Sequence, residues 1–228
     1  MANNYVTITL DTTAPANPSV LIDGGSQYAT DTLVDLTIGT DDVNTTEYQM
    51  KIWGSVDTTF DVNVQGTEEA SSWITYTTGK QIRISEVEEQ KTISIKIRDE
   101  VFNESAIVSD TIIYDATKPQ VTVNAPDKPK ISKITGRNVS NFSFTADVPF
   151  EEYLVKVVNS AGATNDLGTQ ILTTNGSVNT GGTGTFDTST APIQVTINGT
   201  DLEVANGGSG DNIVIKVFVR DVAGNWSA

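Results

Sequence analysis

The stretch Thr92-Ile93-Ser94-Ile95-Lys96-Ile97-Arg98 decides the fold of this chain. Its three isoleucines alternate with polar side chains, and successive side chains of an extended chain point to opposite faces. This period of two predicts a β-strand with one buried face and one solvent-facing face. No stretch of the sequence shows a helical period over three turns, so we expect an all-β protein.

Similar short runs recur along the whole chain. They cover residues 20–22, 33–38, 48–53, 73–76, 82–84, 92–98 and 108–114 in the first half, and 121–124, 142–147, 153–158, 193–197, 202–204 and 213–220 in the second. Short strands separated by turn residues are typical of an immunoglobulin-like β-sandwich. The pair Asn198-Gly199 predicts a β-hairpin between its flanking strands, because these residues accept positive φ. Residues 173–189, rich in Gly, Thr and Asn, predict a long exposed loop.

The two halves of the chain repeat each other. Residues 47–52 resemble 152–157, and residues 96–105 resemble 217–227 when aligned on Arg-Asp and on Asn-x-Ser. One block order repeated twice indicates two copies of one fold. The stretch from Asp115 to Pro119 is a short linker in which proline ends the preceding strand. We therefore expect a strand and linker at 1–15, an immunoglobulin-like domain at 16–115 and a second at 116–228.

A third match concerns the ends of the chain. Residues 10–15 resemble 114–119, and an alternating strand precedes each of them. The N-terminal residues thus look like the last strand of a domain, and the second domain lacks such a strand. An open sheet edge invites strand addition, so we expect exchange between chains, giving a homo-oligomer or a head-to-tail assembly. The residues expected at this interface are Tyr5, Val6, Ile8, Leu10 and Trp226. The alternative is that residues 1–10 pair with the first domain's own edge or fray.

Composition excludes several classes of function. The 228 residues hold 14 Lys and Arg against 29 Asp and Glu, a formal charge of -15. Nucleic-acid binders need clustered basic residues, so no nucleic-acid partner is expected. The absence of Cys and His removes thiolate nucleophiles, the usual zinc ligands and the usual general base. No segment has the apolar length needed to cross a membrane, and the opening MANNYVTITL lacks the features of a signal peptide.

Residues 10–15, 48–54 and 219–227 resemble bacterial and bacteriophage immunoglobulin-like repeats. In that family an Asp-Thr-Thr-Ala-Pro linker opens each domain, and an Arg-Asp-x-x-Gly-Asn turn lies near its end. The resemblance covers nearly the whole chain, although residues 100–103 read Glu-Val-Phe-Asn where Ala-Gly-Asn is typical. It implies an accessory protein of a tailed-phage virion that decorates the capsid or the tail. Such a protein is made in the bacterial cytoplasm, ends in the extracellular particle and has other virion structural proteins as partners.

No catalytic residue emerges from the sequence, and we expect no enzymatic activity. Adjacent carboxylates such as Asp41-Asp42 and Glu151-Glu152 do not face each other, whereas glycosidases need two carboxyl groups across a cleft.

Two candidate binding sites are considered instead, and calcium is a possible ligand, not an expected cofactor. Calcium prefers several carboxylate and carbonyl oxygens, and the candidate ligands are Asp99, Glu100, Asp115 and Asp221; the alternative is that such Asp residues bond turn amides. No other cofactor is expected. The alternative function is recognition of bacterial surface glycans by Trp73 and Tyr76, beside the loop at 57–72, although packing is the favoured role of both rings.

Overall fold

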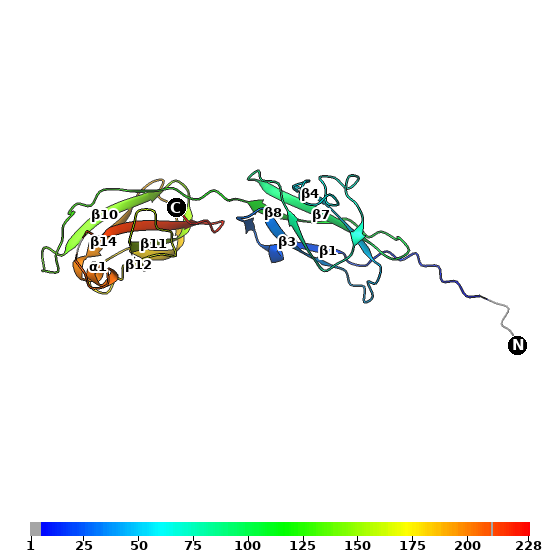
Figure 1. Ribbon diagram of the computed structural model, residues 1–228, viewed down its shortest axis with the longest axis horizontal. Coiled ribbons are helices and arrows are strands. Elements are labelled where there is room, and N and C mark those ends of the chain that lie inside the picture. Colours follow the sequence, from blue (N-terminus) through cyan, green and yellow to red (C-terminus); the bar gives the residue numbers. More distant parts are fainter. Residues whose placement is uncertain (1–5, 211) are drawn as a thin grey trace. The chain divides into compact units, whose positions relative to one another are not determined.

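The computed structural model describes residues 6–210 and 212–228 of the chain. The chain divides between Ala116 and Thr117 into two compact units, called unit 1 and unit 2 below. This division falls one residue after the expected one. Each unit holds two β-sheets with a hydrophobic core between them (Figure 1). The predicted all-β class, with two tandem immunoglobulin-like β-sandwich domains, is confirmed.

Unit 1 contains a three-stranded and a five-stranded sheet. The first has the order β1-β3-β6, with β1 (Ser19–Ile22), β3 (Leu33–Gly39) and β6 (Gly79–Arg83). The second has the order β2-β8-β7-β4-β5, with β2 (Tyr28–Ala29), β8 (Val108–Tyr114), β7 (Gln90–Arg98), β4 (Gln49–Gly54) and β5 (Ile74–Thr75). A short 3-10 turn, η1 (Asp23–Gly25), separates β1 from β2.

The strand β7 has the alternation that the sequence predicts. Ile93, Ile95 and Ile97 are fully buried, and they pack against inward residues of both sheets. β7 pairs with β4 on one side and with β8 on the other. Ile112 of β8 enters the same core and is 1% exposed. The core of unit 1 is therefore closed on this side by β8.

Unit 2 also contains two sheets. The first has the order β14-β10-β9, and in the second β11 pairs with β12, β13 and β15. The strands are β9 (Val121–Val123), β10 (Val139–Ala146), β11 (Phe150–Val158), β12 (Thr169–Gln170), β13 (Gly181–Phe186), β14 (Ile193–Asn198) and β15 (Val214–Asp221). Aromatic rings fill much of the core, and the ring centroids of Phe144 and Tyr153 lie 5.4 Å apart.

The predicted hairpin after β14 is wrong. Residues 199–205 form the helix α1 (Gly199–Ala205) instead of a turn and a strand. Asn198 does not adopt the positive φ of a hairpin turn; its φ is -94°, and its side chain accepts a hydrogen bond from the Thr200 amide as a helix N-cap. The backbone of Gly199 lies so close to Ser132 that a Cβ atom would be 2.2 Å from the Ser132 carbonyl oxygen. Nowhere in the described ranges is a helix long and apolar enough for a membrane span.

The predicted loop at 173–189 is also partly wrong, because it contains the strand β13. Gly182 pairs with Tyr153 of β11. A Cβ atom on Gly182 would lie 3.0 Å from the Tyr153 ring, so this glycine lets β13 approach the aromatic core. A glycine-rich strand has few of the side chains that identify strands in a sequence, which explains why the pattern was missed.

The same turn follows β7 in unit 1 and β15 in unit 2. The Asp99 amide donates to the Asn103 carbonyl at 3.2 Å, and the Asp221 amide donates to the Asn225 carbonyl at 3.0 Å. Phe102 has a φ of 69° in the place where Gly224 has a φ of 101°. Phe102 therefore adopts the left-handed conformation that the usual glycine favours, and the turn keeps its shape despite the unusual residue.

The shared turn sets the correspondence between the units. Arg98 lies opposite Gln49, and Arg220 lies opposite Glu152. Gln49 thus corresponds to Glu152, which differs by two residues from the alignment of the repeated blocks. Because the side-chain period of a strand is two, this shift keeps every residue on its face. The sequence shows that the fold is repeated, but the pairing of β7 with β4 and of β15 with β11 sets the residue-by-residue correspondence between the two copies.

Candidate interaction surface

The strand β15 differs from its counterpart β7 in having an unpaired edge. β7 has strands on both sides, whereas β15 pairs with β11 on one side only. Apart from the single bridge between Arg220 and Trp226, no strand within residues 6–210 and 212–228 pairs with the other edge of β15. The backbone donors and acceptors of an open edge are available to an added strand.

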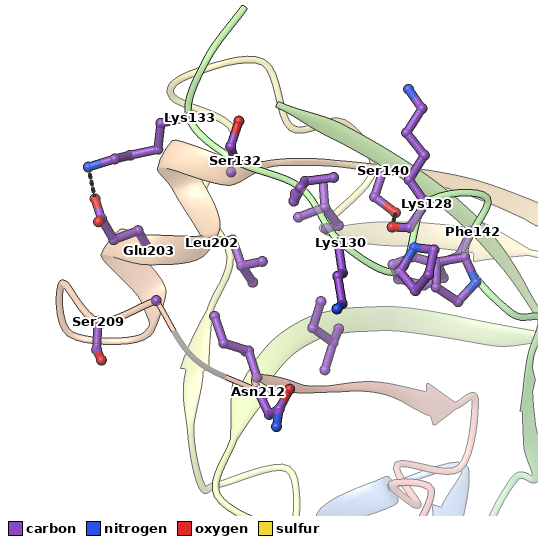
Figure 2. A pocket seen from close by; sticks show the side chains of 18 of the residues that line it. Lys128, Lys130, Ser132, Lys133, Ser140, Phe142, Leu202, Glu203, Ser209 and Asn212 are labelled. Carbon is purple, nitrogen blue, oxygen red and sulfur yellow. Dashed lines mark hydrogen bonds and ion pairs between the residues drawn. The ribbon is translucent and has the colours of Figure 1, made fainter. Parts of the chain in front are cut away.

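A groove of about 920 Å³ lies beside the N-terminal part of this edge. It is bordered by the segment that follows β9, by α1 and by the start of β15. Figure 2 shows Leu202 on one side of the groove and Phe142 on the other. Ile213 and Ile215 line it from the chain leading into β15 and from β15 itself. The groove therefore offers apolar side chains next to free backbone groups.

The residues at the start of β15 are more exposed than the corresponding residues of β7 in unit 1. Counting back from the shared turn, Ile213 and Ile215 correspond to Lys91 and Ile93 of β7. Lys91 and Ile93 are 0% exposed, and β8 pairs with both of them. Ile213 and Ile215 are only half-buried. The groove thus lies where β8 completes the sandwich in unit 1.

The rim of the groove carries charged side chains. Lys133 forms an ion pair with Glu203 of α1 at 2.9 Å, drawn as a dashed line in Figure 2. The Ser140 hydroxyl donates to the Lys128 carbonyl at 2.7 Å and holds the bordering segment against β10. Lys130 is exposed at the same rim. Charged side chains therefore border a groove that also has apolar lining residues.

The residues expected at the strand-exchange interface fall into three groups. Val6, Ile8 and Leu10 are 81%, 85% and 86% exposed and belong to no strand. Tyr5 lies outside the described residues. Trp226 is half-buried and packs in a small cluster with Phe218, so it lies beyond the groove. Sequence reasoning missed the groove residues, since Ile131, Leu202 and Phe142 come together only through folding.

Two of the aspartates expected to bind calcium, Asp99 and Asp221, accept hydrogen bonds within the turn that both units share. The Asp99 carboxylate accepts hydrogen bonds from the Val101 amide at 3.0 Å and the Asn103 amide at 2.8 Å. The Asp221 carboxylate accepts from the Asn225 amide at 2.8 Å. Both aspartates are buried, at 1% and 4% exposure.

The other two calcium candidates do not complete such a site. Glu100 is exposed and Asp115 is half-buried. Within the part of the chain that the structure describes, no group of three or more Asp, Glu, His or Cys side chains is placed to hold a metal ion. Calcium binding stays a prediction.

The rings proposed for glycan binding are half-buried. The Lys51 ammonium lies 5.2 Å from the centroid of the Trp73 ring, and the Arg98 guanidinium lies 4.3 Å from it. The Tyr76 hydroxyl donates to the Ile38 carbonyl at 3.3 Å, and its ring packs against the core. Burial raises the pKa of Tyr76. Trp73 is therefore an aromatic ring in contact with cations, and Tyr76 is a packing residue.

Comparison with known proteins adds similarities of fold only. No protein-family model and no curated protein matches the chain. Among solved structures, the fibronectin(III)-like modules of CbhA from Clostridium thermocellum are similar, with a TM-score of 0.47 and 10% identity over 92% of this chain and 90% of theirs. The chicken CNTN1 FN1-FN3 domains have a TM-score of 0.36 and 9% identity over 94% of this chain and 63% of theirs. The D00-D0 domain of Intimin has a TM-score of 0.30 and 11% identity over 93% of this chain and 97% of its own.

With identities under 25% and TM-scores below 0.5, these likenesses say nothing of function. The sheets themselves define the class: this chain is an immunoglobulin-like repeat protein with two tandem β-sandwich units.

Proposed function

We propose that this chain is a non-enzymatic structural and adhesive protein that acts through its surfaces and sheet edges. The observation that carries the proposal is the apolar groove bordered by the segment that follows β9, by α1 and by the start of β15. A groove of this kind suits a protein segment better than a small reacting molecule, because apolar side chains from several segments line it. The same fold serves many functions, so the site and not the fold supports this proposal.

Within this class we propose a role in a bacteriophage virion, as a decoration protein of the capsid or tail. Its support is the resemblance of the linker at 10–15 and of the turn at 219–227 to bacterial and phage immunoglobulin-like repeats. A role in assembly also suits two sandwich units joined by a short linker with Pro119. Other virion proteins are the partners that this role requires.

The second candidate is a module that binds bacterial surface glycans. Its support is Trp73, whose ring is only half-buried and lies near two cationic side chains. Aromatic faces stack on sugars, and cations favour acidic sugars electrostatically. Phe102, 62% exposed and 4.3 Å from the Arg98 guanidinium, extends this surface.

Two measurements separate these functions. The first is co-sedimentation of the purified chain with phage particles, which a virion component should show. The second is a glycan array probed with the wild-type chain, with Trp73→Ala and with Trp226→Ala as the matched tryptophan control. Hits lost only in Trp73→Ala would support the glycan module. Silence on the array together with co-sedimentation would support the virion role, and silence in both assays would remove both candidates.

A further inference from the structure

We propose that Arg98 and Lys51 of unit 1, together with the rings of Trp73 and Phe102, form a binding site for a carboxylate-bearing sugar. This inference rests on the glycan-binding function given above as the second candidate, and it names the class of glycan and the residues that select it. Its basis is a difference between the two units: unit 2 neutralises the corresponding arginine, and unit 1 does not.

The arginine that precedes the shared turn is neutralised in unit 2. Arg220 lies opposite Glu152 in the pairing of β11 with β15, and its Nε atom donates to the Glu152 carboxylate at 3.1 Å. An arginine that is paired with a carboxylate has little charge left for a ligand. The centroid of the Trp226 ring lies 6.0 Å from this guanidinium. Unit 2 therefore has a ring close to its arginine, but the cation there is already paired.

In unit 1 a neutral amide takes the place of that carboxylate. Arg98 lies opposite Gln49, and its Nε atom donates to the Gln49 side-chain oxygen at 2.7 Å. The Nη2 atom of Arg98 donates to the same oxygen. Gln49 thus supplies an acceptor, as Glu152 does, but no negative charge. A guanidinium has five N–H donors, so Arg98 keeps both its charge and donors for a ligand.

The acidic side chains on this face of β7 serve a different cation. The Lys96 ammonium forms ion pairs with Glu68 at 2.7 Å and with Glu104 at 3.0 Å. Glu104 forms a backbone bridge with Arg98, yet its carboxylate pairs with Lys96. The carboxylates that could have neutralised the arginine are therefore committed elsewhere.

Lys51 adds a second cation to the same face. It lies opposite Lys96 in the pairing of β4 with β7. Over the described ranges 6–210 and 212–228, neither Lys51 nor Arg98 forms an ion pair with a carboxylate. The chain holds 29 acidic residues against 14 basic ones, so two cations without an acidic partner form a local positive field that favours an anion.

Two aromatic rings adjoin these cations. The centroid of the Trp73 ring lies 4.3 Å from the Arg98 guanidinium and 5.2 Å from the Lys51 ammonium. The centroid of the Phe102 ring lies 4.3 Å from the same guanidinium. Trp73 is half-buried and Phe102 is 62% exposed. A sugar can stack its apolar face on such a ring while its carboxylate accepts hydrogen bonds from the guanidinium.

The backbone of Phe102 gives an independent indication. Its φ is 69°, in the place where Gly224 of unit 2 has a φ of 101°. A residue with a Cβ atom is disfavoured in this left-handed conformation, and backbone strain of this kind clusters at functional sites. Here the strain places an exposed aromatic ring beside an unpaired cation, which a glycine at the same position would not do.

The test uses the full 228-residue chain and a panel of acidic oligosaccharides built from galacturonic, glucuronic or sialic acid. Each has a matched neutral probe, made by reducing its carboxyl groups to alcohols. Titration calorimetry measures both. We expect at least one acidic probe to bind, its reduced form to bind roughly tenfold more weakly because the charge-assisted hydrogen bonds are lost, and the acidic affinity to fall as salt is added.

Gln49→Glu installs in unit 1 the ion pair that unit 2 already has. The variant should therefore melt at or above the wild-type temperature and bind the acidic probe roughly tenfold more weakly. Gln90→Glu is the matched control, since Gln90 is exposed at the other end of β7. It adds the same charge and should keep the wild-type affinity.

Phe102→Gly separates binding from folding. Glycine adopts the left-handed conformation without strain, so unit 1 should not melt earlier, whereas the affinity for the acidic probe should fall because a ring is lost. A residue with a purely structural role would instead lower the melting temperature when it is removed.

Four results would overturn the inference. They are equal binding of an acidic probe and its reduced form, an unchanged affinity in Gln49→Glu, equally tight binding of a hexaglutamate peptide, and no binding of any acidic probe. The first would leave the glycan function standing, since neutral sugars would still bind. The third would mean that the site selects negative charge and not sugar. The glycan function itself fails only if neutral glycans on the array are silent as well.

Discussion

Replacement of Asp99 by alanine tests the role of the turn that both units share. Three hydrogen bonds reach its buried carboxylate, from the Val101 amide at 3.0 Å and from the Asn103 amide and side-chain nitrogen at 2.8 Å each. A hydrogen bond to a charged group contributes about 1.5–3 kcal/mol. The cost of burying the carboxylate offsets part of this sum, and the freed Val101 amide is exposed enough to bond water. We therefore expect Asp99→Ala to destabilise unit 1 by about 2–4 kcal/mol.

For a unit of this size, such a loss lowers the melting temperature by roughly 10–25 °C. Calorimetry of the full chain measures it, because two compact units can melt separately. Asp221→Ala should lower the transition of unit 2 and leave that of unit 1 in place, which assigns the two transitions. Glu100→Ala is the matched control, since Glu100 is exposed and surface changes cost within about 0.5 kcal/mol.

The calcium hypothesis makes a different forecast for the same variants. A bound ion would make Glu100→Ala and Asp99→Ala similarly costly, and EDTA would lower the melting temperature of the wild-type chain. A turn held by hydrogen bonds predicts no effect of EDTA. An Asp99→Ala chain that melts like the wild type, or a Glu100→Ala chain that melts as early as Asp99→Ala, would contradict the role of these hydrogen bonds in the turn.

Three further predictions concern stability. Gly199→Ala should destabilise unit 2 by about 1–3 kcal/mol, because the added Cβ would lie 2.2 Å from the Ser132 carbonyl oxygen. Gly162→Ala is the control: a Cβ there meets no atom within 4 Å, so stability should change by less than about 1 kcal/mol. Urea unfolding of both variants measures the difference. Burial opposes ionisation of Asp201, but hydrogen bonds from neighbouring polar groups outweigh it and hold its pKa below the ordinary value; its contribution is present above about pH 4 and lost as the pH falls through the folded pKa, so acid unfolding of unit 2 should begin at higher pH in Asp201→Asn. Burial, with a hydrogen bond to a nearby carboxylate, raises the pKa of Tyr48 to about 12; this contribution is complete below about pH 10 and lost as the pH rises toward 12, so Tyr48→Phe should shift alkaline unfolding of unit 1 to higher pH.

Sequence patterns predicted strands in which buried apolar side chains alternate with solvent-exposed polar ones, and they missed a strand that lacks this alternation. β7 was predicted because Ile93, Ile95 and Ile97 alternate with polar residues. β13 was missed because it is rich in glycine and is held by pairing with β11. Such a strand shows no alternation of apolar and polar side chains in the sequence. Hydrogen bonding to β11 holds it in the sheet instead.

The segment from Asn198 to Val204 shows how tertiary context changes a local signal. Asn-Gly is a strong hairpin signal, yet here Asn198 caps a helix whose Leu202 lines the groove. Residue 199 has to lack a Cβ atom because the Ser132 backbone lies close to it, and not because a turn needs a positive φ. Such a contact, between residues far apart in the chain, leaves no trace in a window of sequence.

The sequence by itself determined that the chain is all-β, that its fold occurs twice and that residues 6–10 have the pattern of a last strand. These properties follow from side-chain period and from repeated blocks, which are local. Only the tertiary structure decided the register between the repeats and the groove at Ile213. Pairing between strands sets the register, and the packing of segments far apart in the chain forms the groove, so neither is visible in a short window of sequence.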